Sequence, residues 1–211
     1  MAHEPTVFVV DDDAAVSTAI TRLLKSVNMP VETFSSPTAF LQACRPDRPG
    51  CVLLDLRMPE LDGLQVQAEL LARDIHLPIV MISAHGEVES AVRALKSGAV
   101  DFLRKPYQPK VLLERLREAI ALDERNRAVL AARAAQQAAL GQLTPREREV
   151  FDRILLGRTS KQTAVELGLS SKTVDIHRAH ILLKLQLGSV VEVIREYQWC
   201  LARSAGAEPN A

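Results

Sequence analysis

Four short apolar runs in the first half of the chain are each followed by polar side chains that can carry chemistry. In chain order these are Asp11, Asp12 and Asp13 after Val7–Val10, Asp55 after Cys51–Leu54, Ser83 after Ile79–Ile82, and Lys105 after Val100–Leu103. Because ligands of parallel sheets bind at the carboxyl ends of the strands, these groups are expected to meet at one edge. Their convergence is a more specific signal than any single acidic residue.

Carboxylates held a few ångströms apart repel one another by roughly 1–4 kcal/mol per pair. A divalent cation removes that cost, and oxygen ligands favour Mg²⁺ or Mn²⁺, whereas no His/Cys set indicates zinc. A carboxylate beside such an ion, with a hydroxyl and an ammonium nearby, suits phosphoryl transfer. Asp55 would attack phosphorus, and the metal and Lys105 would neutralise the developing charge on oxygen.

The pattern around these residues predicts five β-α units. The predicted strands are 7–10, 31–34, 51–54, 79–82 and 100–103, and the predicted helices are 14–27, 37–44, 63–73, 87–97 and 109–121. Runs that are almost wholly apolar are typical of parallel strands covered on both faces. We therefore expect an α/β domain over residues 1–121, with a five-stranded parallel, doubly wound sheet.

The second half of the chain is predicted to be all α. Residues 110–140 contain neither Pro nor Gly, so the last helix should run on into a helical linker over 122–140 that Gly141 closes. Four helices are expected in a domain over 141–203, at 145–156 (with Thr144 as N-cap), 160–167, 171–185 and 189–202. The three residues 168–170 have the length of a helix-turn-helix connection, and 204–211 are expected to form a flexible tail.

Helix 171–185 has a face that suits DNA. Ile176 and Ala179 would point away from its packed side and could meet thymine methyl groups, and Asp175 could accept a hydrogen bond from cytosine. Basic side chains would contact phosphates. The candidate DNA-contacting residues are Lys161, Ser171, Lys172, Thr173, Asp175, Ile176, Arg178, Ala179 and Lys184.

Charge and cysteine usage are compatible with this division. Residues 1–121 carry 13 basic and 16 acidic residues, and residues 122–211 carry 13 and 10, a small asymmetry typical of an acidic ion-binding module joined to a DNA-binding one. Cys44, Cys51 and Cys200 lack metal-like spacing and are interpreted as small hydrophobes of a reducing compartment. The sequence has neither a signal peptide nor a run of about 20 apolar residues, so we expect a cytoplasmic protein.

The first half resembles the receiver domain of two-component response regulators. The matching motifs are Val9–Asp13, Leu54–Pro59 with Asp62 and Gly63, Ser83–Gly86, and Phe102–Pro106. By this resemblance Asp55 is the phosphoacceptor, and Asp11, Asp12, Asp55 and the Arg57 backbone carbonyl hold Mg²⁺. Ser83 and Lys105 would contact the phosphoryl group, Ser83 and Phe102 would form the switch, and the Lys105–Pro106 peptide bond would be cis. His85, two residues after Ser83, could tune phosphoryl lifetime or be a surface loop residue.

The second half is similar to a LuxR-type domain. The motifs are Leu143–Val150, Gly157, Lys161, Ala164, Leu167–Ser170, Lys172–Val174 and His177–Arg178. One departure is Thr159–Thr163, where the family often has Asn-Lys-Glu-Ile-Ala. By the same resemblance the last helix would pair two DNA-bound domains, although it could also pack on its own bundle. The order receiver, helical linker, LuxR-type domain resembles the FixJ-type response regulators.

This organisation predicts a transcription factor controlled by phosphorylation. A sensor histidine kinase would phosphorylate Asp55, the surface around 87–97 and 100–103 would rearrange, and the homodimer would bind a double-stranded operator and act on RNA polymerase. Enzyme activity would be limited to self-phosphorylation from small donors and autodephosphorylation. An aspartyl-phosphate phosphatase is the enzyme alternative, but Arg57 stands where many such enzymes need a second acid. A receiver that is never phosphorylated and a quorum-sensing regulator are further alternatives that the acidic set and the N-terminal half disfavour.

Overall fold

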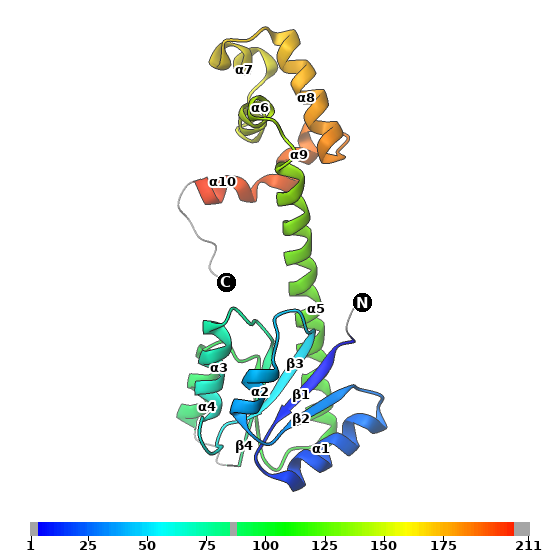
Figure 1. Cartoon of the computed structure of the whole chain (residues 1–211), viewed down its shortest axis with the longest axis vertical. Helices are drawn as coiled ribbons and strands as arrows, with labels where there is room; N and C mark the ends of the chain where they lie inside the picture. Colours follow the sequence, from blue (N-terminus) through cyan, green and yellow to red (C-terminus); the bar gives the residue numbers. More distant parts are fainter. Residues whose placement is uncertain (1–3, 85–87, 205–211) are drawn as a thin grey trace. The chain divides into compact units, whose positions relative to one another are not determined.

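A computed structural model describes residues 4–84 and 88–204. The chain divides into two compact units, Met1–Ala128 and Val129–Ala211. Figure 1 labels most of their helices and strands. Among the described residues, no helix is both long enough and apolar enough to cross a membrane.

The first unit is built on a five-stranded parallel sheet with the order β2-β1-β3-β4-β5. The strands are β1 (Thr6–Val10), β2 (Val31–Phe34), β3 (Gly50–Asp55), β4 (Ile79–Ser83) and β5 (Asp101–Arg104). The helices are α1 (Ala14–Ser26), α2 (Pro37–Ala43), α3 (Gly63–Ala72), α4 (Val88–Lys96) and α5 (Pro109–Leu140). The predicted doubly wound α/β fold is confirmed, with element bounds shifted by one or two residues and α5 extended through the expected linker.

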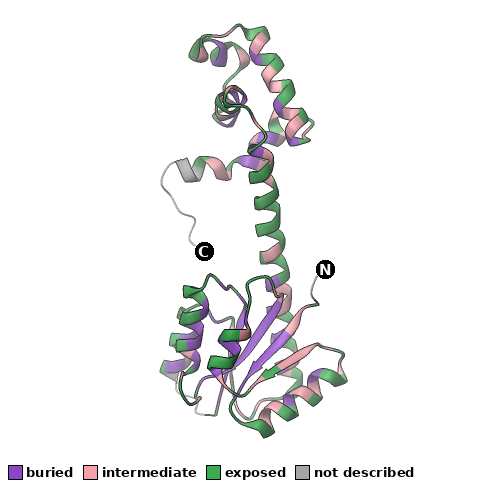
Figure 2. Ribbon diagram, viewed as in Figure 1, coloured by how far each residue is buried: buried purple, intermediate pink, exposed green. Residues whose placement is uncertain are grey.

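Alternation along the strands divides the core into two layers. Phe8, Val52 and Leu54 face the helices α2, α3 and α4, whereas Val9 and Leu53 face α1 and α5. All six residues of β3 are buried, and the purple strands of Figure 2 mark this double-sided burial. Near-continuous apolar strands are therefore explained by helices on both faces of the sheet.

A clamp fixes the middle of α5 to the amino end of β3. The buried Asp123 carboxylate accepts hydrogen bonds from the Gly50 backbone N–H at 2.8 Å and from Arg127 Nε at 2.7 Å. Arg127 also donates to the carbonyls of Pro46 and Arg48, at 2.9 and 2.6 Å. Gly50 has φ +138°, and a side chain there would strike the carbonyl oxygen of Thr6, so this clamp closes on a position that only glycine fits.

The second unit contains the end of α5 and five short helices: α6 (Pro145–Leu155), α7 (Ser160–Leu167), α8 (Ser171–Leu185), α9 (Val190–Tyr197) and α10 (Trp199–Ser204). Thr144 caps α6 in a capping box with Glu147, as the sequence indicates. Gly168 ends α7 in the left-handed conformation at φ +65°, and Ser170 caps α8. This is the expected helix-turn-helix connection.

The single helix predicted over 189–202 is wrong, because the chain breaks it at Gln198 into α9 and α10. Tyr197 lies in the core against Phe151, with ring centroids 5.5 Å apart. Trp199 instead donates from Nε1 to Gln136 Oε1 of α5 at 2.9 Å. Two large aromatic residues thus have partners on different elements, and the break between them allows both contacts.

No disulfide joins the three cysteines, all of which lie in the described part of the chain. Cys44 and Cys51 are buried and Cys200 is half-buried. Burial raises the pKa of the Cys51 thiol to about 12, to which the nearby Asp123 charge adds. A thiol protonated at neutral pH acts as a small hydrophobe, as the sequence predicts for Cys51.

Candidate functional site

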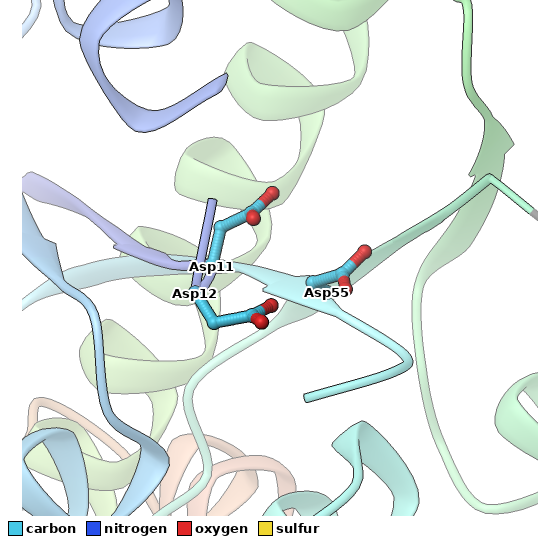
Figure 3. Close-up of side chains that lie close together, drawn as sticks. All are labelled: Asp11, Asp12 and Asp55. Atoms are coloured by element: carbon cyan, nitrogen blue, oxygen red, sulfur yellow. The ribbon is translucent and has the colours of Figure 1, made fainter. Parts of the chain in front are cut away.

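An acidic pocket forms at the carboxyl edge of the sheet, where β1 and β3 end side by side. Val10 pairs with Leu54 in the β1–β3 register, so the residues that follow, Asp11 and Asp55, emerge next to each other. Figure 3 shows Asp11, Asp12 and Asp55 grouped at this edge. One carboxylate oxygen from each lies within 4.8 Å of the others, as expected from the strand ends.

Burial divides the three carboxylates. Asp11 is 1 % exposed and Asp55 is 6 % exposed, whereas Asp12 is exposed. Asp13, the third residue of the run, caps α1 by accepting hydrogen bonds from Ala15 and Val16 N–H at 2.8 and 3.3 Å. The run therefore contributes two residues to the pocket and one to the helix that follows it.

Lys105 supplies one ammonium to the two buried carboxylates. Its Nζ lies 2.7 Å from Asp11 Oδ2 and 3.0 Å from Asp55 Oδ1. The Lys105–Pro106 peptide bond is cis, as predicted, and the Lys105 N–H donates to the Ser83 carbonyl at 2.8 Å. The hydrogen bond to Ser83 ties the lysine, which follows β5, to the end of β4, and its ammonium reaches the ends of β1 and β3.

The pKa values in the pocket reflect two acids sharing one cation. Burial raises the pKa of Asp55, and hydrogen bonding and charge from Lys105 offset only part of that rise. Burial alone would lower the pKa of Lys105, but hydrogen bonds to Asp11 and Asp55 outweigh it and raise the pKa. The lysine therefore stays charged while the aspartate is incompletely compensated.

The donor set fits a hard divalent cation. Three carboxylates face one ammonium, which leaves excess negative charge, and their oxygens are the ligands that Mg²⁺ and Mn²⁺ prefer. Arg57 is exposed and lies in the loop directly after β3, where its backbone N–H interacts with the Asp55 carboxylate.

Ser83 and Phe102 occupy the neighbouring strands. Ser83 is the last residue of β4 and is 1 % exposed. Phe102 is half-buried on β5, where it packs against the core layer below α2, α3 and α4. Both lie on the β4–β5 side of the pocket, and His85, two residues after Ser83, lies outside the described residues.

Two features of the pocket were missed by sequence reasoning. A Cβ atom at Gly63 would lie 2.7 Å from the Asp55 carbonyl oxygen, so the amino end of α3 packs directly on the Asp55 backbone. The sequence signal for this packing was a glycine immediately after Asp62, the N-cap of α3. Lys105 and Pro106 also border an apolar cavity of about 580 Å³ between α1 and the start of α5. No single sequence motif marks that cavity, because its lining comes from separate elements.

The candidate DNA-contacting residues lie at the amino end of α7 and along α8. The exposed ones are Lys161, Ser171, Lys172, Asp175, Ile176 and Ala179, and the half-buried ones are Thr173, Arg178 and Lys184. Ile176, 49 % exposed, is an apolar side chain on a helix whose other face packs into the core through Val174, Ile181 and Leu185.

Four of these residues have side-chain partners inside the unit, and one of them is Asp175, which accepts from the Ser160 hydroxyl at 2.6 Å. Lys184 Nζ lies 2.6 Å from Glu147 Oε2 and 3.2 Å from the Gln142 carbonyl. The Thr173 hydroxyl is 2.8 Å from that of Ser170, the α8 cap. Arg178 Nη1 donates to the Ser160 hydroxyl at 3.0 Å. The Ser160 contact was also missed, because no motif marks it.

Comparison with known proteins matches each unit to a family. Residues 7–117 match the model of the response regulator receiver domain, and residues 141–197 match that of bacterial regulatory proteins, luxR family. The chain is 40 % identical to Nodulation protein W of Bradyrhizobium diazoefficiens over 189 residues, covering 90 % of this chain and 83 % of that protein. It is 34 % identical to Transcriptional regulatory protein FixJ of Azorhizobium caulinodans, covering 99 % and 97 %.

A solved structure shows the same likeness. The response regulator StyR superposes with a TM-score of 0.83 at 37 % identity, covering 92 % of this chain and 98 % of that one. With both family matches, the long relatives and the acidic pocket together, the chain belongs to the response regulators, as a transcriptional regulator that joins a receiver domain to a LuxR-type DNA-binding domain.

Proposed function

We propose that Asp55 is the phosphoacceptor of this regulator and that a sensor histidine kinase is the phosphoryl donor. The observation that carries the proposal is the ammonium of Lys105 shared by Asp11 and Asp55, at 2.7 and 3.0 Å. The Asp55 carboxylate is only partly neutralised, so one of its oxygens can attack phosphorus. The Lys105 ammonium beside it can then neutralise charge on the phosphoryl group.

In the proposed transfer, an oxygen of Asp55 forms a bond to phosphorus as the bond between phosphorus and the donor histidine nitrogen breaks. The histidine nitrogen keeps the bonding electron pair. Lys105 and the Ser83 hydroxyl contact the transferred group, and Phe102 moves toward the core when Ser83 engages it. Asp11, Asp12, Asp55 and the Arg57 backbone carbonyl would hold Mg²⁺ or Mn²⁺, which when bound supplies positive charge to the phosphoryl oxygens.

We propose that phosphorylation acts through dimerisation. Rearrangement around α4 and β5 would pair two receivers, and the paired LuxR-type domains would then bind both halves of an operator through the nine candidate residues of α7 and α8 and regulate transcription with RNA polymerase. Exposed Val92 and Leu95 on α4, at 43 % and 45 %, support this choice of face.

The proposed division of the chain is a receiver over 1–121, a helical linker over 122–140, a DNA-binding domain over 141–203 and a tail over 204–211. The boundary between the compact units, after Ala128, lies within that linker. Catalysis would be limited to self-phosphorylation from small donors and autodephosphorylation, and the protein would work in the cytoplasm. Residues 205–211 of the tail lie outside the described residues.

The primary test is intact mass after incubation with acetyl phosphate and Mg²⁺. We expect one added phosphoryl group on the wild type and none on Asp55→Asn or without Mg²⁺. Addition to Asp55→Asn would assign phosphorylation to another residue. Sedimentation and DNA titration at fixed salt test the second step, and phosphorylation without a gain in dimerisation or DNA affinity would contradict the coupling.

A further inference from the structure

A single hydroxyl bridges two charged residues of the helix-turn-helix surface. Ser160, the first residue of α7, donates from Oγ to Asp175 Oδ1 at 2.6 Å. The same oxygen accepts from Arg178 Nη1 at 3.0 Å. Asp175 and Arg178 are one turn apart on α8, so the serine connects the amino end of α7 to the exposed half of α8.

The Ser160 hydroxyl has no part in capping its own helix. Thr159 caps α7, accepting from the Gln162 N–H in a capping box. Ser170 likewise caps α8. Because both caps are made by other residues, removal of the Ser160 hydroxyl leaves the ends of α7 and α8 intact.

The bridge sets how the two charges are presented. Without it, Asp175 could pair directly with Arg178, or turn outward among the basic groups that meet phosphates. With it, Asp175 Oδ1 is engaged, and within the described part of the chain no hydrogen bond occupies Oδ2. An exposed carboxylate oxygen held in one orientation can accept a hydrogen bond from the exocyclic amine of cytosine in the major groove.

We propose that Ser160 is a positioning residue for base recognition. Its hydroxyl, which accepts from Arg178, holds the Asp175 carboxylate as an acceptor for a base amino group. Supporting residues that fix the side chains of a binding site commonly determine its precision. The proposal rests on the DNA-binding function of the LuxR-type domain and specifies how part of its sequence preference arises.

The test uses the full chain after incubation with acetyl phosphate and Mg²⁺, and duplexes of roughly 20 base pairs with a randomised core. The wild-type protein first selects an enriched sequence from this pool. The affinity of each variant for the enriched duplex is then compared with its affinity for an unselected duplex. We expect Ser160→Ala to weaken binding to the enriched duplex about tenfold, within the range for one base contact. Binding to the unselected duplex and the salt dependence should be unchanged, because phosphate contacts dominate both.

Three controls separate positioning from a general structural effect. Ser160→Thr keeps a hydroxyl and should restore discrimination. In an Asp175→Ala background, Ser160→Ala should cause no further loss, as expected when one residue acts through the other. Thr18→Ala removes an exposed helical hydroxyl of α1 in the receiver and should leave both affinities unchanged.

The outcomes are distinct. Equal loss on both duplexes, an additive loss in the Asp175→Ala background, or no loss at all would overturn the role of Ser160. If the wild type enriches no sequence, the result contradicts sequence-specific DNA binding itself, and the role of Ser160, which rests on it, is overturned as well. Thermal unfolding of Ser160→Ala, expected to match wild type, identifies a folding defect.

Discussion

Two buried carboxylates of this chain, Asp55 in the receiver and Glu147 in the helical unit, have opposite electrostatic environments. Both are nearly inaccessible, at 6 % and 3 % exposed. Burial raises the pKa of Asp55 despite Lys105. Burial alone would also raise the pKa of Glu147, but hydrogen bonds from Lys184 and Thr144 outweigh it and lower the pKa to about 2.

The difference lies in how many acids each ammonium serves. Lys105 is divided between Asp11 and Asp55. Lys184 approaches Glu147 at 2.6 Å, and the Thr144 backbone N–H donates to the same carboxylate at 2.8 Å. A fully compensated carboxylate stabilises a fold, whereas an incompletely compensated one is left able to bind a cation or an electrophile.

Removal of the shared ammonium should have the largest effect. In the absence of divalent cations at pH 7, Lys105→Ala is expected to lower the free energy of unfolding by roughly 3–5 kcal/mol, because two buried carboxylates lose their partner. Phosphoryl uptake from acetyl phosphate should fall below detection. Urea unfolding and intact mass measure the two effects.

Lys110→Ala, at an exposed lysine in the first turn of α5, is the matched control. It should change neither quantity, and Mg²⁺ should recover part of the stability that Lys105→Ala loses. If Lys105→Ala and Lys110→Ala were equally stable without Mg²⁺, the Lys105 ammonium would not stabilise the pocket. The comparison of the pocket with Glu147 would then be wrong.

The same change, carboxylate to amide, should then act with opposite sign at the two sites. Glu147→Gln weakens the contact with Lys184 and is expected to lower stability by roughly 1.5–3 kcal/mol at pH 7. Since the folded pKa of Glu147 is depressed, its contribution is complete above the ordinary value of 4.5 and is lost as pH falls toward about 2. The gap to wild type in urea unfolding should narrow over that range.

Glu149→Gln is the control on the same helix, where Glu149 pairs with Arg146 at the surface. Such exposed pairs contribute at most about 1 kcal/mol. A gap between Glu147→Gln and wild type that is constant with pH would contradict a stabilising, ionised Glu147.

Asp55→Asn should instead raise stability, by roughly 1–2 kcal/mol at pH 7 without divalent cations, because the cost of burying the Asp55 charge is removed and repulsion from Asp11 is relieved. The raised pKa of Asp55 means that wild type loses stability as pH rises from the ordinary value of 3.8 through the folded pKa. The gain should therefore be absent below pH 3.8. In Mg²⁺ the gain in stability should shrink, because the cation stabilises the wild type. Thermal unfolding with and without Mg²⁺ measures the gain and its reduction. A variant less stable than the wild type without Mg²⁺ would contradict the prediction.

The smallest effect is expected at the clamp on the amino end of β3. Arg127→Ala removes three hydrogen bonds, but the vacated space lets water reach Asp123, so the cost should be roughly 1 kcal/mol. Hydrogen exchange should show faster exchange at the Gly50 amide. Acetyl phosphate uptake should be unchanged, since Gly50 and Asp55 lie at opposite ends of β3; a change in uptake would show that the two ends are coupled.

The sequence predicts the pocket well because the order of the strands determines which strand ends are neighbours. Asp11 and Asp55 follow two apolar runs that pair in parallel, so their proximity follows from the fold class alone. The bridge from Ser160 to Asp175 and the pairing of Lys184 with Glu147 were not predicted. Those contacts depend on side-chain rotamers between packed helices, for which helical periodicity gives the face of a residue but not its partner.

The anchors at the two ends of the exposed part of α5 bear on how such genes can recombine. Arg127 holds the helix to the receiver, Gln136 bonds to Trp199, and every residue of 128–135 between them is exposed. A crossover at residue 117, where the receiver match ends, would separate the receiver from Arg127. A crossover at residue 141, where the second match begins, would separate the DNA-binding domain from Gln136. Exchange of DNA-binding domains between response regulators would preserve both anchors only where the splice falls within those eight residues.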